Sequence, residues 1–157
     1  MELRPLLAGD RPHLARMLEG ISEFSASEVS CALELVDLAL GQPAQLDYLF
    51  CVAAEGETLC GYVCYGPTPM TAGTFDLYWI ASDPGARGKG VGSRLVASME
   101  ADLRTRGARL VRVETSAQEA YGPTRAFYER NRYIETARIP EFYKPGDDLV
   151  ILTKRLA

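Results

Sequence analysis

The chain has 157 residues, of which 47% are hydrophobic and 24% are charged, and its formal net charge is −4 at pH 7. This length and balance are typical of one compact domain over residues 1–157. The acidic balance argues against non-specific binding to nucleic acid, which needs a basic surface. No apolar run approaches the roughly 18 residues of a membrane span, and the N-terminal residues lack a secretion pattern. We therefore expect a cytoplasmic protein with no nucleic-acid or membrane partner.

The cysteines argue against a metal centre. All four lie in apolar stretches, where a free cysteine behaves as a small hydrophobic residue. They are Cys31, Cys51, Cys60 and Cys64. Cys60 and Cys64 are close in sequence, but their spacing matches no zinc pattern and the single histidine, His13, is distant. We expect no metal, and no disulfide in a reducing compartment.

The first part of the chain predicts one strand and two helices. The strand covers residues 3–7, and Asp10 caps a helix that runs to about residue 24. Ser25 and Glu28 have the spacing of a capping box, which starts a second helix that ends near Leu40, before Gly41 and Pro43.

The remainder predicts alternating strands and helices. Strands are expected at 48–54, 58–65, 74–82, 109–115, 133–139 and 149–156. A long helix is expected at 89–106, with Val91, Leu95, Met99 and Leu103 along one face, and a short one at 123–130. The order β-αα-βββ-α-β-α-ββ predicts an α/β (α+β) domain, a mixed sheet with about four helices on both faces.

Three glycines fall within residues 88–92, between a predicted strand and a predicted helix. Backbone N–H groups at a helix N-terminus lack intrahelical partners, and the helix dipole adds positive character there. Arg87 and Lys89 add full charges, and Gly90 and Gly92 lack a Cβ that would hold a ligand off the backbone. This segment is therefore predicted to bind phosphate groups.

The spacing argues against two common phosphate loops. A Walker loop needs four residues between its first glycine and the Gly-Lys pair, whereas the interval from Gly85 is too short and Gly90 follows the lysine. A dinucleotide fingerprint needs one residue more than the glycines at 88, 90 and 92 provide, and it normally follows a first strand. The remaining pattern is Arg-x-x-Gly-x-Gly.

This pattern and its surroundings resemble the GCN5-related N-acetyltransferase (GNAT) superfamily, whose loop (Gln/Arg)-x-x-Gly-x-(Gly/Ala) wraps the pyrophosphate of coenzyme A. The strand at 77–81 followed by Asp83-Pro84 resembles the family's fourth strand and its exit. The segment Ala-Phe-Tyr-Glu-Arg at 126–130 resembles the family's Phe-Tyr-Glu-Lys segment. The element order also matches, so the resemblance covers essentially the whole chain. It implies a single GNAT domain with a mostly antiparallel sheet of six to seven strands.

The resemblance implies acetyl-CoA as co-substrate and assigns residues to it. The fourth and fifth strands would splay apart around pantetheine, with the backbone of Trp79, Ile80 and Ala81 on one side. The pyrophosphate would lie on Arg87, Gly88, Lys89, Gly90, Val91 and Gly92. Tyr121 stands where the family often has an asparagine that contacts the cofactor, and Arg132 stands where it usually has glycine, so the detailed contacts there differ.

The resemblance also suggests catalytic residues. Tyr128 corresponds to the tyrosine that protonates the sulfur of coenzyme A, although a purely packing role is the simpler alternative. Asp76 lies where the histone-acetylating branch carries its glutamate base, and a solvated carboxylate at a strand edge is the equal alternative. Asp76 and Tyr78 have the same strand parity and should face the same side. Glu114 and Glu23 are further candidates beside the acceptor.

The acceptor is expected to be an amine, on a small molecule or on a protein. The hairpin at 139–148 carries Glu141, Asp147 and Asp148 beside Phe142 and Tyr143, a combination that suits a cationic amine. A solvated hairpin turn is the simpler interpretation. Two other functions stay open, a non-catalytic acyl-CoA-binding module and an ATP-binding protein, and a homodimer is compatible with the sequence.

Overall fold

The computed structural model describes every residue from Met1 to Ala157. The strands are β1 (Glu2–Arg4), β2 (Leu49–Glu55), β3 (Thr58–Pro67), β4 (Thr74–Ser82), β5 (Leu110–Ser116), β6 (Ile134–Lys144) and β7 (Asp147–Arg155). The α-helices are α1 (Arg11–Glu19), α2 (Ala26–Gly41), α3 (Val91–Thr105) and α4 (Gly122–Arg130). Three short 3₁₀ helices are η1 (Ala8–Asp10), η2 (Pro84–Ala86) and η3 (Glu119–Tyr121).

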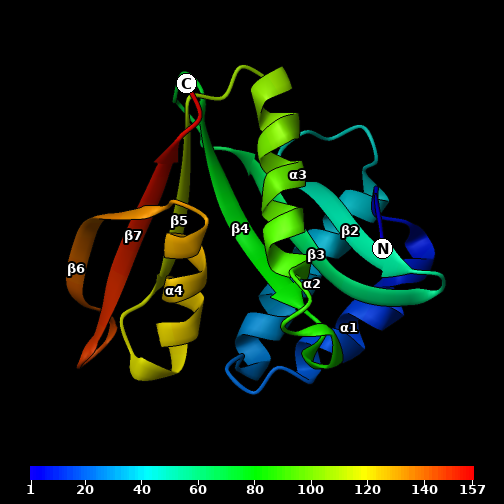
Figure 1. Ribbon diagram of the computed structural model, residues 1–157, viewed down its shortest axis with the longest axis horizontal. Coiled ribbons are helices and arrows are strands. Elements are labelled where there is room, and N and C mark those ends of the chain that lie inside the picture. Colours follow the sequence, from blue (N-terminus) through cyan, green and yellow to red (C-terminus); the bar gives the residue numbers. More distant parts are fainter.

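The seven strands form one mixed sheet in the order β1-β2-β3-β4-β5-β7-β6. Every neighbouring pair is antiparallel except β4 and β5, which are parallel. A parallel pair needs a crossover connection, and α3 supplies it. Figure 1 shows α3 and α4 on the near face of the sheet and α1 and α2 behind it. The predicted fold class and element order are confirmed.

Each face of the sheet has its own hydrophobic core. On the α3 and α4 face, the predicted stripe of α3 is buried, with Leu95, Met99 and Leu103 fully inaccessible. On the other face, Leu14 of α1 and Val36 of α2 are equally inaccessible. Each such side chain contributes about 1.5–3 kcal/mol on burial, so both helical layers are firmly attached to the sheet.

The local signals placed several boundaries well. β4 has the predicted bounds, and the Ser25 hydroxyl accepts the N–H of Glu28 at 3.1 Å, as the capping box requires. The first helix was expected to reach about residue 24 but ends at Glu19. The N–H of Gly20 bonds to the carbonyls of Arg16 and Met17, a tightening that closes the helix, and a turn follows.

The two outer strands also differ from expectation. β1 was expected at 3–7 but ends at Arg4, because Pro5 has no N–H to continue the ladder. β6 extends beyond residue 139 to Lys144, and β7 begins at Asp147. The register of this hairpin slips between Ile139 and Lys144, where Glu141 has a positive φ of 51°. Alternation in sequence does not reveal such an irregularity.

The end of α4 accommodates an arginine at position 132, where the sequence pattern favours glycine. Arg132 has φ 70°, the left-handed conformation in which glycine is usual. The N–H of Tyr133 reaches back to the carbonyl of Tyr128 at 3.0 Å, and that of Arg132 reaches Glu129 at 2.9 Å. The helix therefore keeps the geometry of a glycine-terminated end, at a cost of about 1 kcal/mol for the side chain.

Candidate functional site

The centre of the sheet is open along one half of its only parallel pair. β4 and β5 pair only through Thr74, Phe75 and Asp76, which face Leu110, Val111 and Arg112. Beyond them β5 stays paired with β7 as far as Ser116, and β4 stays paired with β3 as far as Ser82. The backbone of residues 77–82 therefore has no strand partner on its β5 side, and this gap is called the splay below.

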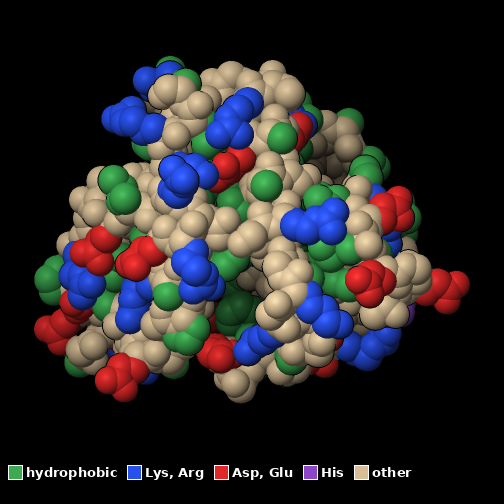
Figure 2. Space-filling model, viewed as in Figure 1, with side chains coloured by type: hydrophobic (Ala, Val, Ile, Leu, Met, Phe, Trp, Pro, Cys, Tyr) green, Lys and Arg blue, Asp and Glu red, His purple; other side chains and the backbone are tan.

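The splay lies between the two helices of the near face. Figure 1 shows β4 and β5 close together near the C-terminus and diverging toward the starts of α3 and α4. The space-filling view has a hollow with an apolar floor at that place, rimmed by basic and acidic side chains (Figure 2). The gap between the strands is thus accessible from this face.

The segment that joins η2 to α3 presents unpaired donors at the end of the splay. The helical ladder of α3 begins with the N–H of Arg94 on the carbonyl of Gly90, at 3.1 Å. No protein acceptor is assigned to the N–H groups of residues 88–93. Gly88 and Gly90 have φ values of 80° and 73°, and space around them is open. These N–H groups and the dipole of α3 form an anion site.

Gly92 has a packing role in addition to the one expected of it. A Cβ at this position would lie 2.8 Å from the Phe127 ring of α4. The missing side chain therefore lets α4 approach α3. Asn131 extends the same contact by donating to the Ser93 hydroxyl at 3.2 Å.

Tyr128 lies under α4, between that helix and the sheet. It is 4% exposed, and its ring packs on those of Phe127 and Tyr133. Burial raises the pKa of its phenol, so the group keeps its proton at neutral pH. Tyr128 donates no hydrogen bond to the protein, whereas the buried Tyr133 hydroxyl is bonded to Glu100 at 3.1 Å.

Asp76 closes the narrow end of the splay. One carboxylate oxygen accepts the Arg112 guanidinium at 2.7 Å and the other accepts the Thr68 hydroxyl at 2.8 Å. Burial, followed by the negative charge of Asp76, raises the pKa of Tyr78 to about 12. Both carboxylate oxygens of Asp76 are already engaged, and its charge is paired with Arg112. The register of the β4–β5 pair places Arg112 opposite Asp76, and the sequence alone does not reveal that register.

A register shift in β4 sets the directions of its aromatic side chains. Cys64 pairs with Trp79 but Tyr65 pairs with Leu77, so Tyr78 is an extra residue in the strand. Trp79 packs edge-on against Phe24 of the α1–α2 loop, with ring centroids 5.5 Å apart. Its side chain is therefore occupied there, and only its backbone is available to the splay.

The comparisons with known proteins match this geometry. The model of the acetyltransferase (GNAT) family matches residues 19–132. The chain belongs to the GNAT family. A blasticidin-S acetyltransferase from Streptomyces morookaense is 44% identical over 126 residues, covering 80% of this chain and 86% of that one. These matches identify the chain as an acetyltransferase.

Solved structures agree with this assignment to the GNAT family. A protein assigned to the family from Desulfovibrio desulfuricans has a TM-score of 0.96 and 41% identity, and each chain covers 99% of the other. An aminoglycoside 6′-N-acetyltransferase in complex with coenzyme A has a TM-score of 0.79 at 15% identity, covering 100% of this chain and 98% of that one. The second likeness concerns the fold alone.

Side chains bridge the open end of the splay in this GNAT domain. The Tyr121 hydroxyl of η3 donates to the backbone carbonyl of Glu23 at 3.1 Å and lies 3.4 Å from the Glu28 carboxylate of α2. Burial and the charge of Glu28 raise the pKa of Tyr121 to about 12. On the other side, Arg87 lies 3.9 Å from the Glu23 carboxylate. The α1–α2 loop thus contacts both the phosphate-binding segment and the start of α4.

The two remaining candidate residues lie apart from each other. Glu114 is on β5, with a side chain 43% exposed and 3.8 Å from Arg112. Lys89 lines a small cavity of about 170 Å³ together with Arg94 and Met1. In the sequence Glu28 stands out only as a capping residue and Phe127 only as part of the segment at 126–130, and Arg112 does not stand out. The contacts of all three join distant segments of the chain.

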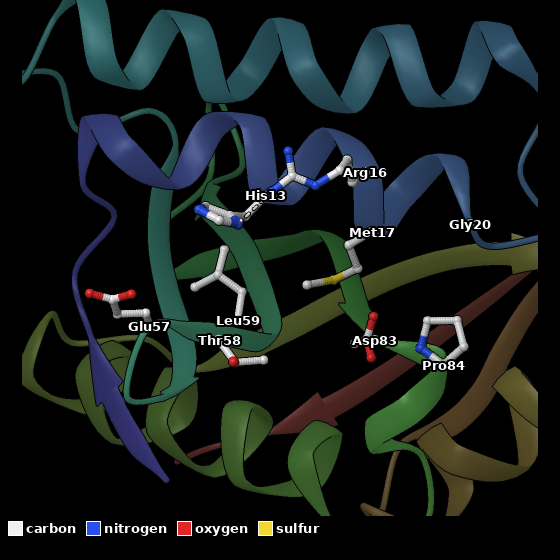
Figure 3. A pocket seen from close by; sticks show the side chains of 9 residues that line it. All are labelled: His13, Arg16, Met17, Gly20, Glu57, Thr58, Leu59, Asp83 and Pro84. Atoms are coloured by element: carbon white, nitrogen blue, oxygen red, sulfur yellow. Dashed lines mark hydrogen bonds between the residues drawn. The ribbon is translucent and has the colours of Figure 1, made fainter.

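A further cavity of the domain lies beside α1, on the face of the sheet opposite α3 and α4 (Figure 3). It measures about 410 Å³ and lies between α1, the β2–β3 turn and the end of β4 (Figure 3). His13 lines it and is bonded to Arg16 at 2.8 Å, so the only histidine of the chain is directed away from the splay. No group of three His, Cys, Asp or Glu side chains is placed to hold a metal, and no helix is long and apolar enough to cross a membrane.

Proposed function

We propose that this acetyltransferase transfers the acetyl group of acetyl-CoA to a primary amine by direct attack in a ternary complex. The observation that carries the proposal is the position of the anion site at one end of the splay. A pyrophosphate on residues 87–92 directs the attached pantetheine along the unpaired edge of β4. That edge can bond to it as an added strand.

The residues assigned to coenzyme A fall into two groups. The N–H groups of Gly88 to Gly92 would hold the pyrophosphate, with Arg87 and Lys89 as flanking charges. The backbone of Trp79, Ile80 and Ala81 would hold pantetheine. A backbone N–H near Ile80 would also stabilise the negative charge that develops on the thioester oxygen. Tyr121 would border the cofactor where the family often has asparagine.

The chemistry balances with one acid and one base. The amine nitrogen attacks the carbonyl carbon of the thioester, the carbon–sulfur bond breaks, and sulfur leaves as a thiolate. Tyr128 would give its phenolic proton to that sulfur, because burial keeps the phenol protonated. The nitrogen loses a proton to a carboxylate, directly or through water.

The arrangement of the carboxylates favours Glu114 over Asp76 as this base. The Glu114 side chain is partly exposed and has only a weak contact with Arg112, whereas both oxygens of Asp76 are bonded. Asp76 and Tyr78 would then position the wall of the splay. Glu23 would border the acceptor from the α1–α2 loop.

Release of free thiol from acetyl-CoA, measured with an amine library, tests the proposal. Blasticidin S belongs in the library because the Streptomyces relative is named for it. The expected result is thiol release with at least one amine, lowered about 100-fold in kcat by Tyr128→Phe with coenzyme A affinity retained. Tyr62→Phe is the matched control, because that hydroxyl is sealed in the core without a partner.

Three results would contradict the proposal. Stabilisation by coenzyme A without thiol release from any amine indicates a binding module. Stabilisation by ATP and not by coenzyme A indicates a nucleotide-binding protein. Equal turnover in Tyr128→Phe and the parent removes Tyr128 from the role of acid.

A further inference from the structure

One buried carboxylate lacks the partner that the other three have. Four carboxylates are buried in the domain, and three form ion pairs of 2.7–2.8 Å, namely Asp10 with Arg4, Asp76 with Arg112, and Glu100 with Lys154. The fourth, Asp147, is 7% exposed and forms no ion pair. An unpaired charge removed from water is costly, and buried charges in proteins are as a rule paired or fully hydrogen-bonded.

The surroundings of Asp147 leave one of its oxygens available. The other oxygen accepts the hydroxyl of Ser116, the last residue of β5, at 2.5 Å. Arg125 of α4 donates to the backbone carbonyls of Ser116 and Gln118 and forms no ion pair with Asp147. The available oxygen is not sealed in the core, because the Tyr62 hydroxyl is the only fully buried side-chain polar atom without a partner.

Asp147 is at the open end of the splay, on the side of the α1–α2 loop. The Ser116 hydroxyl that bonds to Asp147 also accepts the N–H of Gln118, at the start of η3. Asp147 lies opposite Lys144 at the β6–β7 turn. The end of β5, the start of η3 and the β6–β7 hairpin therefore meet at Asp147. In agreement with this position, its charge adds to the raised pKa of Tyr121, whose hydroxyl lies 3.4 Å from the Glu28 carboxylate of α2.

We infer that the amine acceptor carries a second positive charge, apart from the reacting nitrogen, and that Asp147 binds it. The inference rests on the proposed function and specifies its acceptor as a dicationic compound, such as a diamine or an amine with a guanidinium group. Such a cation supplies the partner that Asp147 lacks. Glu28 and Glu114 add to the negative field around it.

A first experiment needs no acceptor. Asp147→Asn keeps an oxygen for the Ser116 hydroxyl but removes the unpaired charge, so the variant should unfold in urea at the same concentration as the parent or a higher one. Asp148→Asn is the matched control. That neighbour contacts Arg138 at 3.6 Å and accepts the N–H of Glu141 at 2.9 Å, so its loss should lower the midpoint. A lower midpoint for Asp147→Asn would assign the carboxylate a structural role and overturn the inference.

A second experiment measures binding with defined probes at constant ionic strength. Cadaverine should raise the melting temperature of the coenzyme A complex, and pentanediol, its neutral analogue, should not. The apparent affinity for cadaverine should fall about 10- to 100-fold in Asp147→Asn and stay unchanged in Asp148→Asn. Equal responses to the two probes, no response to either, or no dependence on residue 147 would overturn the inference.

Turnover separates this inference from the proposed function. Cadaverine and aminopentanol share the reacting amine and differ in the second charge, so kcat/KM should be at least about 10-fold higher for cadaverine. Equal values would overturn the inference and leave the amine acetyltransferase intact. No thiol release with any amine would refute the proposed function, whereas binding of cadaverine that depends on Asp147 would still stand.

Discussion

The two ends of the splay differ in how their charges are satisfied. At the narrow end, Asp76 is bonded to Arg112 and Thr68, and the strands are joined by a backbone ladder. At the open end, Asp147 has a single hydroxyl partner and the walls are joined by side chains such as Tyr121 and Arg87. The difference indicates that the narrow end is built for stability and that the open end keeps its capacity for a ligand.

The largest expected effect tests the narrow end. Asp76→Asn leaves Arg112 with only its weaker contact to Glu114 and should lower the free energy of unfolding by about 2 kcal/mol, less than for a fully buried pair because Arg112 is partly exposed. Urea unfolding measures it. A loss no greater than that of Asp147→Asn would remove the distinction between the two ends.

A second change weakens the contact between α3 and α4 at the open end. Gly92→Ala drives a Cβ into the Phe127 ring and should cost about 1.5 kcal/mol, with weaker binding of coenzyme A. Phe127→Leu in the same chain should restore most of both losses, which chemical unfolding and isothermal titration would detect. Absence of rescue would mean that the methyl group acts on the ligand rather than on α4.

A third change lies outside both ends and provides a baseline. Arg132→Gly relieves a left-handed residue and should raise the free energy of unfolding by about 1 kcal/mol, without affecting thiol release. Thermal unfolding in the presence and absence of coenzyme A would measure it. A fall in stability would show that the Arg132 side chain has a favourable contact of its own.

The smallest effect at neutral pH concerns the tyrosines, which lose protons only in alkali. Burial raises the pKa of Tyr62 and Tyr65 in the core more than those of Tyr78 and Tyr121 near the splay, which rise to about 12. A folded-state pKa above the unfolded value gives stability that is complete below about pH 10 and is lost as pH rises. Phenolate absorbance from Tyr78 and Tyr121 should therefore appear before that from Tyr62 and Tyr65. A single transition coinciding with unfolding would contradict that order.

Local sequence signals predicted most of the fold because they act over a few residues. The capping box at Ser25, the glycines before α3 and the apolar stripe of that helix each specify one element without help from distant residues. The order of the elements resembles that of the GNAT family, and this resemblance predicted a mixed, mostly antiparallel sheet. Errors fell at Glu19 and Glu141, where a tightened turn and a slipped register depend on neighbours in space.

The conformation of residues 87–92 follows from local sequence, whereas the surroundings of Asp147 do not. The glycines before α3 leave the N–H groups of that segment without protein acceptors, and this pattern can be read directly. Asp147 was visible as an acidic residue in a turn, but its burial and its lack of a cation follow from the contact of β5 with the β6–β7 hairpin. Whether a charge is paired is a property of the tertiary structure, and alternation or composition does not record it.

The bridge from Tyr121 to the α1–α2 loop has a consequence for engineering this enzyme. Glu23 and Glu28 come from one part of the chain, and Tyr143 and Asp147 come from another. Residues 87–92, which are proposed to bind coenzyme A, lie between these parts in the sequence. A new acceptor preference can therefore be sought by exchanging two short peripheral stretches while the central one stays constant. Under the proposed function both stretches border the same acceptor, so we expect that they must be exchanged together.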